Sequence, residues 1–157
     1  MKILYYKQEK SYTCGAAAMR IVLNSLGANF NEKEIEKMLG TNDERGTWTK
    51  SFAELANKLN LQFSSKNNSS IEELKSLTED YLIIICFYTS DNEDHYTVIR
   101  QIDKQFIHFS DPWPLYGPDF KMSLKEFEER WKCDFKFEKL EKWFFAIRKS
   151  QLKNSFQ

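Results

Sequence analysis

The chain has 157 residues, and its 23 lysines and arginines balance its 23 aspartates and glutamates. A chain of this length can form one domain with its own hydrophobic core. Balanced charge argues against a global field that attracts nucleic acid, and the longest apolar run, 81–88, is much shorter than a membrane span. The first residues also lack the apolar core of a signal peptide. We therefore expect a soluble, cytoplasmic domain at residues 1–150, followed by a polar tail at 151–157.

The chain contains three cysteines, Cys14, Cys86 and Cys133. An odd number without paired spacing argues against a framework of disulfides and favours a reducing compartment. The absence of a CxxC pair argues against structural zinc. We expect no metal and no organic cofactor.

Helices are expected in the first half of the chain. The apolar residues recur at helical spacing over 14–26, from 31 to 39, over 49–59 and from 70 onward. The first of these segments is apolar on nearly all sides, which is typical of a buried helix.

Strands are expected in the second half. The run 81–88 is rich in β-forming residues and predicts a central strand. Segments 95–102 and 105–111 predict a hairpin, and a short helix over 123–131 precedes a last strand near 143–148. Helices followed by strands indicate an α+β fold with N-terminal helices packed on a C-terminal antiparallel sheet.

Cys14 stands where a loop enters the first predicted helix. Unpaired N–H groups and the helix dipole at this position favour a thiolate over a thiol, and the thiolate is the nucleophilic form. Gly15 removes a side chain beside the sulfur, so that a substrate backbone could approach. A buried structural cysteine on an alanine-rich helix is an equally good interpretation of this segment alone.

Gln8 lies six residues before Cys14. Its amide could donate a hydrogen bond to an oxyanion that forms near the sulfur, together with the backbone N–H of Cys14. An isolated glutamine in a loop is usually only solvated, so this interpretation depends on the other candidate residues.

The hairpin contains both histidines of the chain, His95 and His108. With a three-residue connection, His95 faces Asp111 across the two strands, whereas His108 points to the other side of the sheet. A carboxylate beside an imidazole fixes its tautomer and stabilises the imidazolium. The interpretation requires a three-residue loop or a bulge, since a shift by one residue reverses the face. Singly, His95 could be a surface residue and Asp111 a turn former.

Three segments resemble the bacteriocin-processing peptidases, which are family 39 of the clan CA papain-like cysteine peptidases: Q-x5-C-G at 8–15, H-Y-T-V at 95–98 and D-P at 111–112. The resemblance extends over about residues 5–148. It implies a papain-like fold with Gln8 as oxyanion donor, Cys14 as nucleophile, His95 as general base and Asp111 as the residue that orients the base.

Members of this family often form the N-terminal domain of an exporter and cut leader peptides after a Gly-Gly pair. Because no membrane span and no P-loop follow, the chain resembles a stand-alone member without transporter domains. We expect a peptidase that acts on a peptide or protein, with a glycine-ending leader as one candidate. The loop aromatics Trp48, Trp113 and Tyr116 could line a groove or cover the core. Two alternatives stay open: a papain-like acyltransferase and a catalytically silent peptide-binding module.

Overall fold

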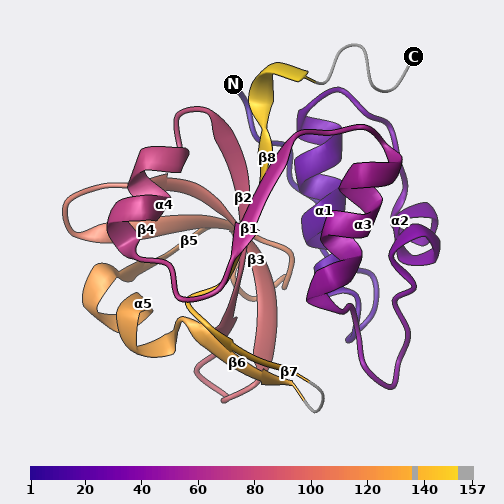
Figure 1. Cartoon of the computed structure of the whole chain (residues 1–157). Coiled ribbons are helices and arrows are strands. Elements are labelled where there is room, and N and C mark those ends of the chain that lie inside the picture. Colours follow the sequence, from indigo (N-terminus) through magenta and orange to yellow (C-terminus); the bar gives the residue numbers. More distant parts are fainter. Residues whose placement is uncertain (136–137, 152–157) are drawn as a thin grey trace.

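The computed structural model describes residues 1–135 and 138–151. A six-stranded sheet stands at its centre, and Figure 1 shows one group of helices on each side of it. The helices of the described residues are α1 (Cys14–Ser25), α2 (Glu32–Leu39), α3 (Thr49–Lys58), α4 (Ile71–Leu77) and α5 (Leu124–Arg130), with a 3-10 turn, η1 (Lys149–Gln151).

All strand pairs are antiparallel, and the order in the large sheet is β1-β8-β2-β3-β4-β5. The strands β6 and β7 form a separate hairpin. The bounds are β1 (Phe63–Lys66), β2 (Tyr81–Tyr88), β3 (Asp94–Ile102), β4 (Phe106–Asp111), β5 (Gly117–Ser123), β6 (Lys132–Phe135), β7 (Glu138–Glu141) and β8 (Phe144–Arg148). The expected α+β class with a papain-like arrangement of helices on an antiparallel sheet is confirmed.

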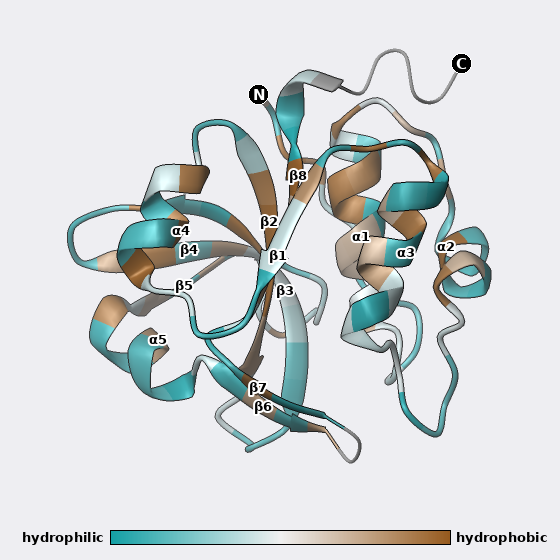
Figure 2. Ribbon diagram, in the orientation of Figure 1, coloured by the Kyte–Doolittle hydropathy of each residue, from teal (hydrophilic) through white to brown (hydrophobic). Residues whose placement is uncertain are grey.

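The sheet divides the core into two apolar clusters because alternate residues of a strand point to opposite faces. Ile84 and Val98 face α1, while Ile83, Ile85 and Ile99 belong to the cluster beneath α4 and α5. Burial on both faces explains why β2 is a continuous apolar run, which is brown in Figure 2.

Several helix starts agree with their sequence signals. The side chain of Asn31 accepts a hydrogen bond from Glu34 N at 2.8 Å and completes a capping box at the start of α2. The Ser70 and Ser123 side chains accept hydrogen bonds from Glu73 N and Glu126 N and so cap α4 and α5, without the reciprocal bond of a capping box. These caps fix where the helices begin and so orient the loops that precede them.

The sequence did not predict four of the strands, β1, β5, β6 and β7. β1, β6 and β7 have four residues each, and β1, for example, reads FSSK with one apolar residue. β5 has seven residues but begins with glycine and proline, which are uncommon in strands. Local alternation is therefore too weak to mark them, and they form because a neighbouring strand or an apolar cluster lies beside them. As a result, strands and helices interleave more than expected.

The expectation of unpaired cysteines is wrong for two of the three. Cys86 of β2 and Cys133 of β6 form a disulfide across 47 residues of sequence, and both are buried. The bond fastens the β6–β7 hairpin to the central sheet and leaves Cys14 as the free cysteine. The argument for a reducing compartment therefore loses its basis in the cysteine count.

Residues 152–157 of the expected tail lie outside the described residues. Within the described ranges, no helix is long and apolar enough to cross a membrane.

The disulfide predicts a specific thiol count. Protein prepared without reductant and then denatured should show one thiol per chain with a chromogenic disulfide reagent, and three after reduction, because only Cys14 is unpaired. Three thiols before reduction would contradict the pairing, and Cys14→Ala, with no thiol before reduction, is the control.

Candidate active site

Cys14 is the first residue of α1 and is partly exposed, while the three alanines that follow Gly15 are buried. Thr13 makes no side-chain cap to the helix; its hydroxyl instead donates to Lys10 O at 2.9 Å. The first helical bond runs from Ala17 N to Thr13 O, at 2.9 Å. The earlier N–H groups, including that of Cys14, therefore have no partner within the helix and lie next to the sulfur.

Gly15 has a different role from the one expected. A Cβ added there would lie 2.6 Å from Thr47 Oγ1 and 3.1 Å from Tyr96 Cδ2. The space beside Gly15 is thus filled by the chain itself and gives no access to a substrate. It allows the loop that contains Thr47 to pack against the start of α1.

The strands β3 and β4 bring His95 and Asp111 together, but in a register that differs from the expected one. Ile99 pairs with Phe109, and a bulge at Arg100 shifts the pairing nearer the turn. Direct opposition of His95 and Asp111 was therefore a wrong expectation, as was the pairing of His108 with Val98. The two side chains are diagonal neighbours on one face, which is still within reach.

His95 Nε2 lies 2.7 Å from Asp111 Oδ1, and both side chains are buried. Because Asp111 occupies Nε2, Nδ1 is the ring nitrogen left to interact with the thiol of Cys14, which lies close enough to affect the pKa of the ring. Burial alone would lower the pKa of His95. The charge of Asp111, its hydrogen bond and the contact with Cys14 outweigh burial and raise this pKa to about 10.

Aromatic rings and one backbone donor hold this pair in place. Asp111 Oδ1 also accepts a hydrogen bond from Trp113 N at 2.9 Å. The rings of Trp113, Tyr116 and Phe87 meet the imidazole edge to face at 5.6 to 6.3 Å. They exclude water from the His95–Asp111 contact, which strengthens it.

Gln8 lies beside this group. Its backbone N–H donates to Pro112 O at 2.7 Å, which ties the loop before Cys14 to the residue after Asp111. Its side-chain Nε2 donates to Lys10 O and Ser11 O, at 2.9 and 3.3 Å. Both amide protons are therefore used inside the loop, while Oε1 is buried without a partner.

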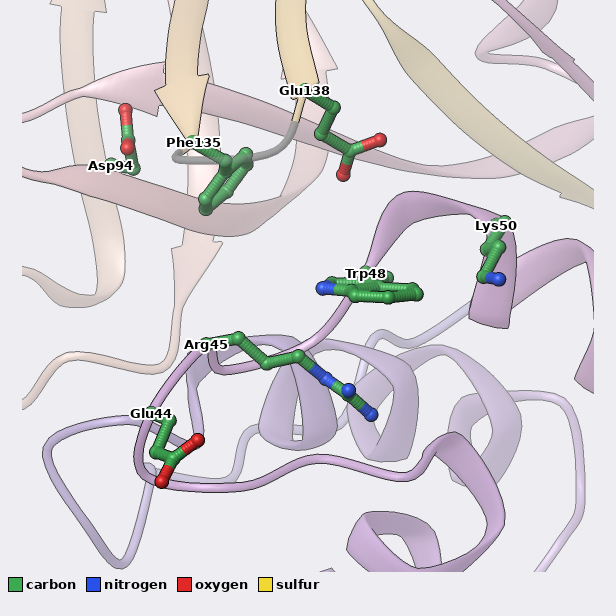
Figure 3. Close-up of a pocket in the computed structure, with 7 residues that line it drawn as sticks. All are labelled: Glu44, Arg45, Trp48, Lys50, Asp94, Phe135 and Glu138. Carbon is green, nitrogen blue, oxygen red and sulfur yellow. The ribbon is translucent and has the colours of Figure 1, made fainter.

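A pocket of about 390 Å³ opens between the loop before α3 and the β6–β7 hairpin. Figure 3 shows Phe135 and Glu138 on one wall and Trp48 on the opposite wall, with Arg45 extended beneath the indole. Asp94, which precedes His95, also lines it. The pocket lining does not include Cys14, His95 or Asp111; a further link to them is Thr47, which precedes Trp48 and packs against Gly15. Trp48 lines the pocket, whereas Trp113 and Tyr116 pack around the imidazole.

Sequence reasoning missed Phe135 and Glu138. Glu138 accepts hydrogen bonds from Thr49 N and Thr49 Oγ1 at 3.1 and 2.7 Å, and the ring of Phe135 stacks on Tyr96 at 5.7 Å. No local motif marks either residue, because a hairpin distant in sequence carries them to the pocket. Among the described residues, no three histidine, cysteine or acidic side chains gather in a way that could hold a metal ion.

Comparison with known proteins gives consistent results. The model of the Peptidase C39 family matches residues 2–135. An uncharacterized protein of Methanothermobacter thermautotrophicus is 31% identical over 105 residues, which is 67% of this chain and 68% of that protein.

Two solved structures share the fold. The peptidase domain of Streptococcus ComA, described as a bifunctional ABC transporter involved in a quorum-sensing pathway, is 20% identical with a TM-score of 0.76, covering 94% of this chain and 98% of that one. A double glycine motif protease from an AMS/PCAT transporter, solved with its leader peptide, is 17% identical with a TM-score of 0.70, covering 94% and 91%. Since the family model spans most of the chain, this protein belongs to the peptidase C39 family and is a cysteine peptidase.

Proposed function

We propose that the chain hydrolyses peptide bonds through a thioester on Cys14, with His95 as acid and base and Asp111 as the residue that orients the imidazole. One observation carries the proposal: a single buried ring contacts both the Asp111 carboxylate and the Cys14 thiol. A raised pKa of His95 keeps the ring protonated, so that a thiolate and an imidazolium can coexist.

The proposed reaction has two steps. The thiolate of Cys14 forms a bond to the substrate carbonyl carbon, and the His95 proton passes to the amine as the C–N bond breaks. Water then attacks the thioester, releases the acid and restores the thiolate and imidazolium. If an amine replaced water as acceptor, the product mass would show it, which separates hydrolysis from acyl transfer.

The oxyanion needs donors beside the sulfur. The Cys14 N–H has no helical partner and is one candidate; Gln8 is the other. In the present arrangement the Gln8 amide donates to Lys10 O and Ser11 O, so its use in catalysis requires a side-chain rotation when substrate binds. Apo geometries of this kind often tighten only in the substrate complex.

We propose a peptide as substrate, with Gly-Gly at the cleaved end as the first sequence to test, because one structural neighbour is a double glycine motif protease. The pocket between Trp48 and Phe135 would hold a side chain upstream of the cut. Its two aromatic walls favour an apolar or aromatic residue there.

Cys14→Ala should abolish turnover, since loss of a nucleophile costs on the order of 10⁶-fold in kcat. Peptide amides of aminocoumarin that end in Gly-Gly provide the assay.

Iodoacetamide at pH 5.5 should label Cys14 quickly in the wild type and slowly in His95→Ala. His108→Ala, whose histidine bonds to Asp103, should react like wild type. Full cleavage by Cys14→Ala would contradict the mechanism. If instead the wild type bound the peptide but its Cys14 was not alkylated, the result would favour a catalytically silent binding module.

Asp111→Asn should lower the pKa of His95 from about 10, because the charge that opposes the effect of burial is lost. Nuclear magnetic resonance of the two histidine rings measures this, with His108→Ala for assignment and Asp43→Asn on the surface as control. We expect kcat to fall by about 10⁴-fold. An unchanged titration would show that Asp111 does not act on the ring.

The same titration has a signed effect on stability. A histidine whose pKa is raised in the folded state stabilises the fold, and the full effect is present at pH values below its pKa in the unfolded chain, about 6.5. That contribution is lost as pH rises through about 10. The wild type should therefore lose its stability advantage over Asp111→Asn across this window in thermal melts, and a constant difference would contradict the assignment.

Trp48→Ala should flatten the preference for one upstream side chain by about tenfold, because a pocket wall is removed. A library of Gly-Gly coumarin amides, varied one position at a time, measures the preference. Phe106→Ala, at the far end of the β3–β4 hairpin, is the matched control and should keep the wild-type profile. Equal profiles for Trp48→Ala and wild type would exclude the pocket as the specificity site.

A further inference from the structure

Glu32 is the first residue of α2, and only 1% of it is exposed. Glutamates are rarely buried so completely without a cationic partner, and Glu32 makes no salt bridge among the described residues. Instead, both carboxylate oxygens accept the backbone N–H of Glu9, at 3.1 and 3.2 Å. Burial of the Glu32 carboxylate costs free energy, and its hydrogen bonds go to the single N–H group of Glu9, the residue directly after Gln8.

The backbone is held on both sides of Gln8. The Gln8 N–H donates to Pro112 O, and the next N–H, that of Glu9, donates to Glu32. Two consecutive peptide groups are therefore fixed by partners from distant parts of the chain, one beside Asp111 and one on α2. Their positions determine where the Gln8 side chain begins.

The rest of the loop closes on itself. Lys10 N donates to Thr13 Oγ1 at 3.0 Å, and Thr13 Oγ1 donates back to Lys10 O at 2.9 Å. The Thr13 hydroxyl also lies beside the Glu32 carboxylate, and this proximity lowers the pKa of Glu32. The carboxylate therefore contacts the loop at its start, through Glu9, and at its end, next to Cys14.

We propose that Glu32 is a positioning residue for the candidate oxyanion site, in which its carboxylate fixes the Gln8 loop relative to Cys14. The inference rests on the proposed roles of Gln8 and Cys14. In this proposal α2 contributes to catalysis without touching the substrate, because its first residue supplies the carboxylate that binds the loop. A misplacement of about 1 Å in such a group can cost up to a hundredfold in rate.

The charge state of Glu32 gives the proposal a pH signature. Burial raises the pKa of Glu32 to about 7. The hydrogen bond from Glu9 N and the nearby Thr13 hydroxyl oppose this rise, and the nearby charges of Glu9 and Glu36 increase it. Lys10 pairs with Glu36 at 3.2 Å, and Arg20 lies 3.8 Å from Glu9, so both cations are already engaged. Above neutral pH the ionised carboxylate binds the N–H more strongly.

Folding and positioning respond to this ionisation with opposite signs. Because the folded pKa exceeds the unfolded value of 4.5, the folded chain binds more protons between pH 4.5 and about 7, and stability falls as pH rises through that window. Over the same window, rising pH strengthens the hydrogen bond from Glu9 N to the Glu32 carboxylate, because the carboxylate becomes ionised. A purely structural residue would give only the stability effect.

The test compares Glu32→Gln with Glu54→Gln, an exposed glutamate on α3, as matched control. The probe is the 4-nitrophenyl ester of N-acetylglycylglycine, whose hydrolysis needs the oxyanion site but no protonation of an amine. We expect Glu32→Gln to lower kcat by about tenfold, with KM within about twofold, because the oxyanion forms only in the transition state. Glu54→Gln should equal wild type.

A double-mutant cycle shows whether Glu32 acts through Gln8. In the Gln8→Ala background, Glu32→Gln should change kcat by less than about twofold, since the group it positions is gone. The same fold-loss in both backgrounds would overturn the proposal, as would wild-type kcat in Glu32→Gln. The wild type alone gives a second measurement: kcat should rise through a step near pH 7 that Glu32→Gln lacks, and an identical profile for the two would also overturn it.

Failure of the proposed function looks different. If Cys14→Ala still hydrolysed the ester with wild-type kcat, the nucleophile assignment would be wrong whatever Glu32 does. If Cys14→Ala is inactive and only the Glu32 comparison fails, the peptidase mechanism stands without this positioning residue.

Discussion

The buried contact between His95 and Asp111 is the constraint on which the site depends. It joins the first residues of β3 to the last residue of β4, and the bulge at Arg100 sets the register in which the two can meet. Burial would otherwise deprotonate the ring, so the nearby carboxylate determines its charge. Asp111 also accepts the Trp113 N–H, and Pro112 O accepts that of Gln8. The end of β4 therefore positions both the imidazole of His95 and the loop in front of Cys14.

Much of this arrangement could be predicted from local pattern. The central strand β2 has the predicted bounds, and α1 begins at Cys14 as expected, because apolar periodicity and caps are local signals. The side chains of His95 and Asp111 share a face, as alternation requires. The exact register could not be predicted, since a bulge is a tertiary feature that adds one residue without a sequence mark.

The missed elements share a physical cause. The strands β6 and β7, the Cys86–Cys133 disulfide and the pocket wall at Phe135 all depend on one hairpin that folds back over distant residues. Its strands are short and charged, so only tertiary contact defines them. Gly15 illustrates the same limit: its small size was predicted to matter, but the neighbour that needs the space, Thr47, lies 32 residues further along the chain.

The central claim is that sulfur, imidazole and carboxylate act as one acyl-transfer unit. Rapid acid quenching of wild-type protein mixed with N-acetylglycylglycine 4-nitrophenyl ester, followed by intact mass and peptide mapping, tests it most directly. The account predicts an acyl group on the peptide that contains Cys14, formed quickly and then lost to water. Turnover without any adduct, or an adduct on another residue that forms and decays at the turnover rate, would contradict it.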